Sequence, residues 1–90
     1  METRRRVTIV NKRGLHARAS AKFVAAVSGM EGTDVTVSKS GHSAQGGSIL
    51  GLMMLGAARG DEVDIAAAGH EAETRLAELV ALVESGFGEE

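Results

Sequence analysis

Three short segments of this chain alternate apolar with polar residues, and this alternation constrains its fold more than any other feature. The segments are RRRVTIV at residues 4–10, TDVTVS at residues 33–38 and GDEVDIAAAG at residues 60–69. Because successive side chains of a strand point to opposite faces, each segment predicts a strand with one apolar face. A sheet of such strands buries one face and leaves the other in water, as antiparallel and mixed sheets do. Helices of the same chain must then cover the apolar face.

Helical periodicity is found in three other segments. The first helix is predicted over residues 17–28, and the last runs from the acidic residues after Gly69 to Gly86. Between them, Ser48 stands at an N-cap position before a short apolar helix that ends near Gly56. The residues expected on the buried faces are Ser20, Phe23, Val24 and Val27 in the first helix, and Ala72, Leu76, Leu79, Val80 and Val83 in the last.

A fourth strand is predicted in KSGHSAQ at residues 39–45, entered through a turn at Ser40-Gly41, and it completes the order β-α-β-β-α-β-α. If the first two strands run parallel across a right-handed crossover, the chain forms an α+β fold. We expect a two-layer, open-faced sandwich, with a four-stranded, mainly antiparallel sheet and three helices on one face. Ninety residues with 43% apolar content predict a single domain over residues 1–90.

The composition limits where the protein works and what it binds. It has no cysteine, and no uncharged apolar run reaches the roughly 18–20 residues of a membrane span. We expect a cytoplasmic protein with no membrane partner. Residues 1–22 hold seven Lys and Arg against one Glu, whereas residues 61–90 hold nine Asp and Glu against one Arg. A basic end attracts an anion or an acidic partner, although solvated surface charges give the same counts.

His16 lies between Gly14 and the predicted first helix, where the free N–H groups of a helix N-terminus make an anion site. Neutral imidazole is a nucleophile near neutral pH, and a phosphoryl group on it would be held by the amides of Ala17 and Arg18 and by the Arg18 guanidinium. The same residues also fit an ordinary helix boundary, with His16 as a weak cap and Arg18 as a solvated charge. The local pattern leaves both interpretations open.

Ser48 and the helix after it each allow two interpretations. Ser48 fits an N-cap and, compatibly, a phosphoacceptor at the same helix end. The short helix cannot bury every apolar side chain, since Leu52 and Leu55 already supply an inward face. Some of the four remaining apolar side chains should therefore be exposed, namely among Ile49, Leu50, Met53 and Met54. Exposed Met and Leu suit a partner surface, whereas a tightly wedged core helix would carry the same residues.

Several other classes of function find little support. His42 and His70 show no spacing that would close a metal site with His16, so we expect neither metal nor cofactor. The arginines at residues 4–6 suggest a nucleic-acid binder, but two Phe and no Tyr or Trp leave little on which bases could stack. Walker, Rossmann and Ser-His-Asp patterns are absent, so an ordinary enzyme lacks its parts.

Taken together, NKRGLHARAS at residues 11–20, GGSILGLMMLG at residues 46–56 and the element order resemble HPr, the histidine-containing phosphocarrier of the bacterial phosphoenolpyruvate-dependent phosphotransferase system. The likeness covers about residues 4–86. The family motif G-[LI]-H-x-R-P-A is matched from Gly14 to Arg18. The resemblance implies an HPr-like fold and a monomeric carrier rather than an enzyme.

The resemblance also assigns roles to single residues. It implies that His16 takes a phosphoryl group on Nδ1 from enzyme I and passes it to a histidine of an enzyme IIA. Arg18 matches the arginine that assists the phosphohistidine, and Ser48 falls where many members are phosphorylated by the ATP-dependent HPr kinase/phosphorylase. The patch that docks both enzyme I and enzyme IIA corresponds to Ile49, Leu50 and Met53.

Two departures from the family pattern bear on these expectations. Ala19 replaces the usual proline, so we expect a looser first turn that depends on other contacts. Gly47 replaces the lysine that often precedes the regulatory serine. The Ala19-Ser20 variant favours the nitrogen-related branch, whose carrier is called NPr, over the branch of sugar uptake. The alternative function is therefore a regulatory module gated by phosphorylation, with regulatory proteins as partners and no role in sugar transport.

Overall fold

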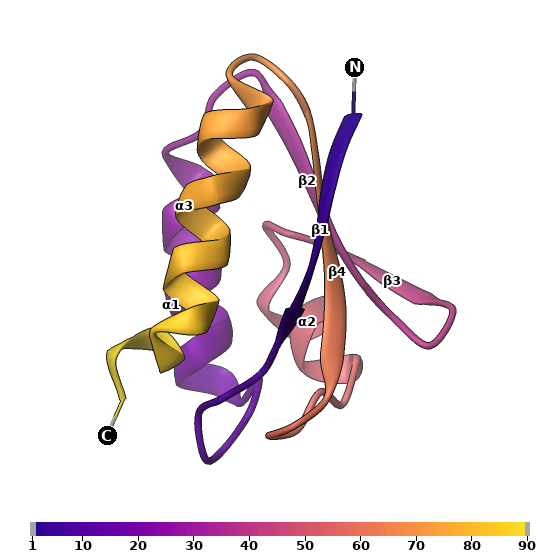
Figure 1. The fold of residues 1–90 in the computed structure, drawn as a ribbon, viewed down its shortest axis with the longest axis vertical. Helices are drawn as coiled ribbons and strands as arrows, with labels where there is room; N and C mark the ends of the chain where they lie inside the picture. The colour runs from indigo at the N-terminus through magenta and orange to yellow at the C-terminus, as the bar shows by residue number, and fades with distance from the viewer. Residues whose placement is uncertain (1, 90) are drawn as a thin grey trace.

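The computed structural model describes residues 2–89, and within them the predicted order β-α-β-β-α-β-α is confirmed (Figure 1). In chain order the elements are β1 (Glu2–Thr8), α1 (Ala17–Ser28), β2 (Thr33–Lys39), β3 (His42–Gln45), α2 (Ile49–Met54), β4 (Glu62–Gly69), α3 (Ala72–Glu84) and the 3₁₀ helix η1 (Gly86–Gly88). The sequence patterns did not predict η1. No helix within the described residues is long and apolar enough to cross a bilayer.

The four strands form one sheet in the order β1-β4-β2-β3, and every neighbouring pair is antiparallel. β1 and β2 run in the same direction, which was the condition for the α+β fold, and β4 lies between them. The β2–β3 hairpin turns at Ser40 and Gly41, whose φ angles of 52° and 85° are those of a two-residue hairpin loop. The predicted turn is therefore confirmed.

The apolar positions of the strands share the face of the sheet that the helices cover. Figure 1 shows α1 and α3 beside each other on that face, while α2 packs against α1 and β3 near one end. The inward side chains of the sheet come from the register pairs Val7–Val63, Val35–Ala67 and Val37–Ile65. All five apolar residues predicted for α3 are buried. In α1, Phe23 and Ser20 are buried, whereas Val24 and Val27 are only partly so.

The largest differences from the predicted strand boundaries occur in β1 and β4. β1 was expected over residues 4–10 and spans Glu2–Thr8, while β4 begins at Glu62 rather than at residue 60. Both strands end there because the chain continues into a loop contact outside the regular ladder. Ile9 donates its N–H to the Asp61 carbonyl at 2.8 Å, and its carbonyl accepts from the Gly60 N–H at 2.8 Å. Ile9 stays buried although the regular ladder has ended.

Candidate functional site

The loop between β1 and α1 is held against the segment that follows α2. Gly14 has a φ of 64°, and a Cβ at this position would clash with the Ala57 carbonyl oxygen, so the close backbone approach requires glycine. The buried Leu15 donates its N–H to the same Ala57 oxygen at 3.0 Å. These contacts fix the position of the backbone directly before His16.

His16 is the N-cap residue of α1. Its carbonyl accepts the first helical hydrogen bond, from the Ser20 N–H at 2.9 Å, and its Nδ1 accepts from the Arg18 N–H at 3.2 Å. The Ser20 hydroxyl donates back to the Leu15 carbonyl at 3.2 Å. The first turn is thus tied by contacts other than a proline ring, as the replacement by Ala19 predicts.

Backbone donors surround the imidazole at this helix end. The Arg18 N–H points at Nδ1, while the N–H groups of Ala17 and Ala19 have no acceptor within residues 2–89. The Arg18 side chain is exposed, and no carboxylate of the described residues lies within ion-pair distance of it. With the positive end of the helix dipole, these donors stabilise negative charge in front of Nδ1.

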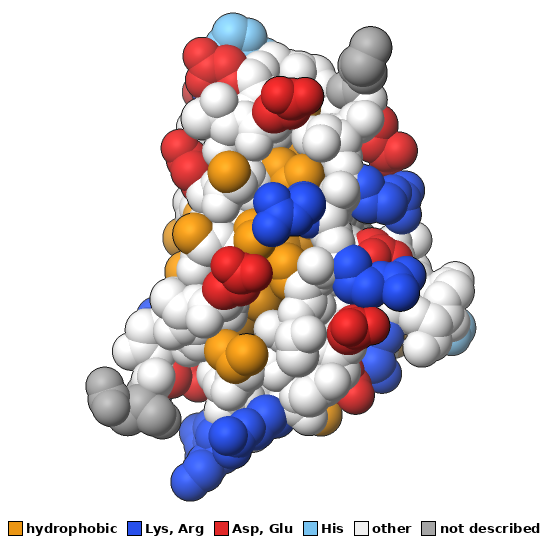
Figure 2. All heavy atoms as spheres, viewed as in Figure 1, with side chains coloured by type: hydrophobic (Ala, Val, Ile, Leu, Met, Phe, Trp, Pro, Cys, Tyr) orange, Lys and Arg blue, Asp and Glu red, His pale blue; other side chains and the backbone are white. Residues whose placement is uncertain are grey.

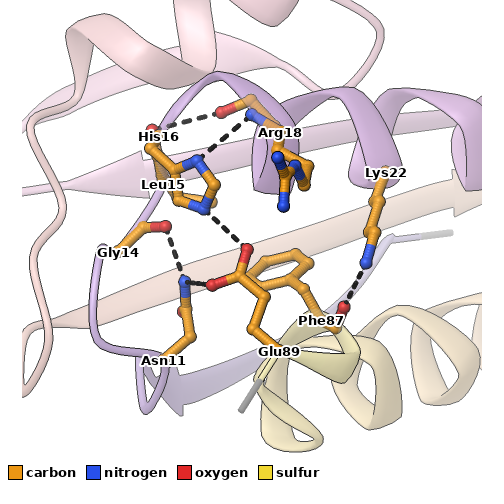
Figure 3. A network of polar contacts seen from close by, with 9 residues as sticks. Asn11, Gly14, Leu15, His16, Arg18, Lys22, Phe87 and Glu89 are labelled. Atoms are coloured by element: carbon orange, nitrogen blue, oxygen red, sulfur yellow. Dashed lines mark hydrogen bonds and ion pairs between the residues drawn. The ribbon is translucent and has the colours of Figure 1, made fainter.

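The C-terminal segment reaches the other nitrogen of the same ring (Figure 3). Glu89 Oε2 lies 2.6 Å from His16 Nε2, and Glu89 Oε1 accepts from Asn11 Nδ2 at 3.1 Å. Asn11 Nδ2 also donates to the Gly14 carbonyl at 2.8 Å, which links the loop to the tail. The His16 and Glu89 side chains are only 21% and 16% exposed. Both nitrogens of the imidazole therefore have a hydrogen-bonding partner, one from a helix and one from the tail.

Phe87 anchors the segment that carries Glu89. The phenyl ring is buried, and the residue adopts the left-handed conformation, with φ at 58°. Its carbonyl accepts from Lys22 Nζ of α1 at 2.7 Å (Figure 3). A core contact and a hydrogen bond to α1 together place the Glu89 carboxylate at His16.

The surroundings of Glu89 favour its ionised form. The hydrogen bond with His16 lowers the pKa of Glu89, and the hydrogen bond from Asn11 and the charge of Lys22 act in the same direction, against the effect of burial. None of Asn11, Lys22, Phe87 and Glu89 was predicted as a site residue. His16 and Glu89 are 73 positions apart, and no periodicity or motif connects them.

α2 presents the second group of predicted residues. The Ser48 hydroxyl accepts the Gly51 N–H at 3.0 Å, so its prediction as an N-cap is confirmed. Leu52 is fully buried. The exposed fractions of the outer side chains are 41% for Ile49, 68% for Leu50, 40% for Met53 and 76% for Met54. Their expected exposure is confirmed, and the alternative of a tightly wedged core helix is wrong. Because Ala57 follows α2 and bonds to Leu15, this surface and His16 lie at the same end of the fold.

The remaining candidates lie in other elements. His42 is exposed at the start of β3, and His70 follows β4 with its Nε2 3.5 Å from Glu71 Oε2. Within residues 2–89 no three His, Cys, Asp or Glu side chains are arranged to hold a metal ion. Two of the N-terminal arginines are paired with acids, Arg6 with Asp64 at 3.0 Å and Arg4 with Glu2 at 3.5 Å.

The pairing of the N-terminal arginines with acids affects how charge is distributed over the surface. Figure 2 shows basic and acidic side chains interspersed along the side where β1 runs, and a basic cluster at the end where the β1–α1 loop lies. On this face of the molecule, a cluster of positive charge therefore lies at the end of the fold that carries His16.

Comparisons with known proteins agree with this architecture. A family model described as "PTS HPr component phosphorylation site" matches residues 3–85. The chain is 33% identical over 90 residues to phosphocarrier protein NPr of Escherichia coli strain K12, covering 100% of both chains. It is 40% identical over 83 residues to phosphocarrier protein HPr of Neisseria meningitidis serogroup A, covering 92% of both chains. The crystal structure of HPr-C-His from Thermoanaerobacter tengcongensis is similar at a TM-score of 0.91, with 39% identity and coverage of 98% of both chains.

Proposed function

This chain belongs to the HPr family of phosphocarrier proteins, and from that premise we propose that His16 carries the phosphoryl group. Nδ1 of His16 takes the group from phosphorylated enzyme I in the cytoplasm and passes it to a histidine of an enzyme IIA. The chain is then a substrate of two transferases, without turnover of its own, and the step needs no metal or cofactor.

The observation that carries this proposal is the position of Nδ1 at the N-terminus of α1. Its lone pair accepts the Arg18 N–H at 3.2 Å in the unphosphorylated protein. When that lone pair forms a bond to phosphorus, the Arg18 N–H becomes free to donate to a phosphoryl oxygen, together with the N–H of Ala17. The Arg18 guanidinium, which has no carboxylate partner within residues 2–89, adds charge-assisted hydrogen bonds to the same oxygens.

Phosphorylation by purified enzyme I and phosphoenolpyruvate tests the role of His16. We expect the wild-type chain to gain an acid-labile, base-stable phosphate, as a nitrogen–phosphorus bond has, and His16→Ala to gain none. His42→Ala is the matched control, because it removes an exposed imidazole on β3, and it should be phosphorylated normally. A phosphate retained in His16→Ala refutes the assignment.

The exposed apolar side chains of α2 are proposed as the docking surface for enzyme I and enzyme IIA, with Ile49, Leu50 and Met53 at its centre. Their exposure and their place at the end of the fold that carries His16 support this role. A single surface would serve both partners, because flexible Met and Leu side chains adapt to different shapes.

Ser48 is proposed as a regulatory site for the HPr kinase/phosphorylase. Incubation with this kinase and ATP should label Ser48, and Gly47→Lys, which restores the residue common in the family, should be labelled faster. Ser48→Ala should take up no label and should lose about 0.5–2 kcal/mol of unfolding free energy in urea, because the N-cap is removed. Ser48→Asp keeps a capping oxygen and should stay close to wild type in stability. A wild-type chain and a Gly47→Lys variant that both remain unlabelled would exclude this regulation.

The second candidate function is a regulatory module of the nitrogen-related branch. The match of NPr from Escherichia coli over the full length of both chains favours it. Phosphorus NMR of the phosphorylated chain, followed by addition of a regulatory or a sugar-type enzyme IIA, separates the two branches. The acceptor that drains the phosphohistidine signal identifies the branch, and drainage by the sugar-type protein alone excludes the regulatory one.

A further inference from the structure

Glu89 lies in the C-terminal segment, beyond the residues 3–85 that the family model matches, yet its carboxylate contacts the imidazole of His16. We propose that Glu89 is a positioning residue, which holds the His16 ring with its proton on Nε2 so that Nδ1 keeps a free lone pair for phosphoryl transfer. This inference rests on the proposed role of His16 as the phosphoryl acceptor.

The two hydrogen bonds of the ring agree on one tautomer. At Nδ1 the partner is the Arg18 N–H, which can only donate, so Nδ1 must be the acceptor. At Nε2 the partner is a carboxylate oxygen, which accepts when ionised, so Nε2 must carry the proton. The opposite neutral tautomer would set two donors face to face at Nδ1 and two acceptors face to face at Nε2. Carboxylates orient imidazoles in the same way in catalytic triads and metal sites.

The position of the carboxylate is itself determined by a chain of contacts. The Asn11 amide nitrogen donates to both the Gly14 carbonyl and Glu89 Oε1, and this pair of acceptors fixes which way the amide faces. Phe87 is buried, and its carbonyl accepts from Lys22, so the segment before Glu89 cannot swing away freely. The tail therefore delivers a carboxylate to Nε2 in a defined orientation.

This arrangement also assists the transfer step. The lone pair of Nδ1 forms the new bond to phosphorus, while the bond from phosphorus to the donor breaks and its electron pair stays with the donor. The proton on Nε2 does not move, so the ring gains positive charge as the bond forms. The Glu89 carboxylate, 2.6 Å from Nε2, lies where it offsets that charge.

Replacing Glu89 with two different residues separates positioning from simple packing. In Glu89→Gln, the amide oxygen must face the Asn11 donor, which leaves the amide NH₂ directed at Nε2. An NH₂ group donates, so Nε2 becomes the acceptor and the ring proton moves to Nδ1, at the cost of the longer, 3.2 Å hydrogen bond from the Arg18 N–H. Glu89→Ala removes the contact without imposing the opposite tautomer. We therefore expect Glu89→Gln to be more impaired than Glu89→Ala, the reverse of the order that lost packing would produce.

The measurements are the tautomer of His16, from long-range proton–nitrogen couplings in ¹⁵N NMR, and the initial rate of phosphorylation by enzyme I and phosphoenolpyruvate. Wild type should show the proton on Nε2. Glu89→Gln should show it on Nδ1 and be phosphorylated about tenfold more slowly, the loss that corresponds to one hydrogen bond to a charged group. Glu78→Gln is the control, because it removes the same charge from an exposed position of α3 and should match wild type in both readouts.

A wild-type ring with its proton on Nδ1 overturns the proposal. So does a Glu89→Gln variant that keeps either the wild-type tautomer or the wild-type rate, or a Glu89→Ala variant at least as impaired as Glu89→Gln. If the wild-type chain takes no phosphate from enzyme I, the proposed function fails, and the NMR measurement still decides whether Glu89 sets the tautomer.

Discussion

The two candidate surfaces of this protein are built in opposite ways. The surface on α2 comes from consecutive residues, with Ser48 capping the helix and Leu50 and Met54 exposed on it. The surroundings of His16 come from the loop after β1, the start of α1 and the C-terminal tail, with a contact between residues 73 positions apart. The first surface is therefore a local structure, whereas the second exists only when the fold brings its parts together. Detaching the tail from α1 should therefore damage the His16 site more than the α2 surface.

The largest difference between the two regions is expected when the tail is detached. Phe87→Ala removes a buried ring and should lower the free energy of unfolding by about 3–5 kcal/mol, since a large core side chain is lost. Met54→Ala removes an exposed side chain of α2 and should change it by less than about 0.5 kcal/mol. Urea unfolding measures both values. Equal losses in the two variants would show that the tail is not anchored as described.

A substitution in α2 should have the opposite effect: it should slow phosphoryl transfer and leave the free energy of unfolding unchanged. Leu50→Asp places a charge in the proposed docking surface and should slow phosphoryl transfer from enzyme I about tenfold at low protein concentration, because one central contact of an interface is lost. Its unfolding free energy should stay near that of wild type. Thr74→Asp, which adds the same charge at an exposed position in the first turn of α3, is the control. Transfer at the wild-type rate in Leu50→Asp would remove α2 from the docking surface.

The smallest expected effect is a difference in acid sensitivity. The pKa of Glu89 is lowered by its hydrogen bond with His16, so its stabilising contribution is complete above about pH 4.3, the ordinary value for Glu, and is lost as the pH falls through the lower folded value. The groups that face Glu89 are His16, Asn11 and Lys22. α2 contains no ionisable side chain, so the α2 surface should not share this dependence.

Urea unfolding at a series of pH values below about 4.3 checks this contribution. The stability of wild type should decline more steeply than that of Glu89→Gln, since the variant has no carboxylate to protonate at this position. The other acids with a lowered pKa, Asp61 and Asp64, are present in both proteins and cancel in the comparison. Parallel curves would mean that the contact between Glu89 and His16 does not stabilise the fold.

Much of the fold was predictable because its determinants are local. The alternation of apolar and polar residues placed Val35 and Val37 on the covered face of β2. The pair Ser40-Gly41 indicated the hairpin turn, in which both residues adopt positive φ angles. The strand ends were less predictable, because β1 stops where Ile9 begins to bond with the loop before β4. That loop lies about 50 positions further along the chain, and a local pattern carries no information about it.

For the candidate site, the sequence determined which atoms are available. The glycine, the histidine and the helix start stand next to one another in the chain, so Nδ1 of His16 facing the Arg18 N–H follows from ordinary N-cap geometry. The partner of Nε2, in contrast, depends on how the whole chain packs. The 3₁₀ helix η1 packs against α3, and the Phe87 carbonyl accepts from Lys22 of α1, so the tail returns to the first loop. The Glu89 carboxylate then meets an imidazole from the opposite end of the chain. A hydrogen bond between residues 73 positions apart depends on their distance in space, and no local sequence pattern reports that distance. For this reason the contact of Glu89 with Nε2 could not be predicted from the sequence.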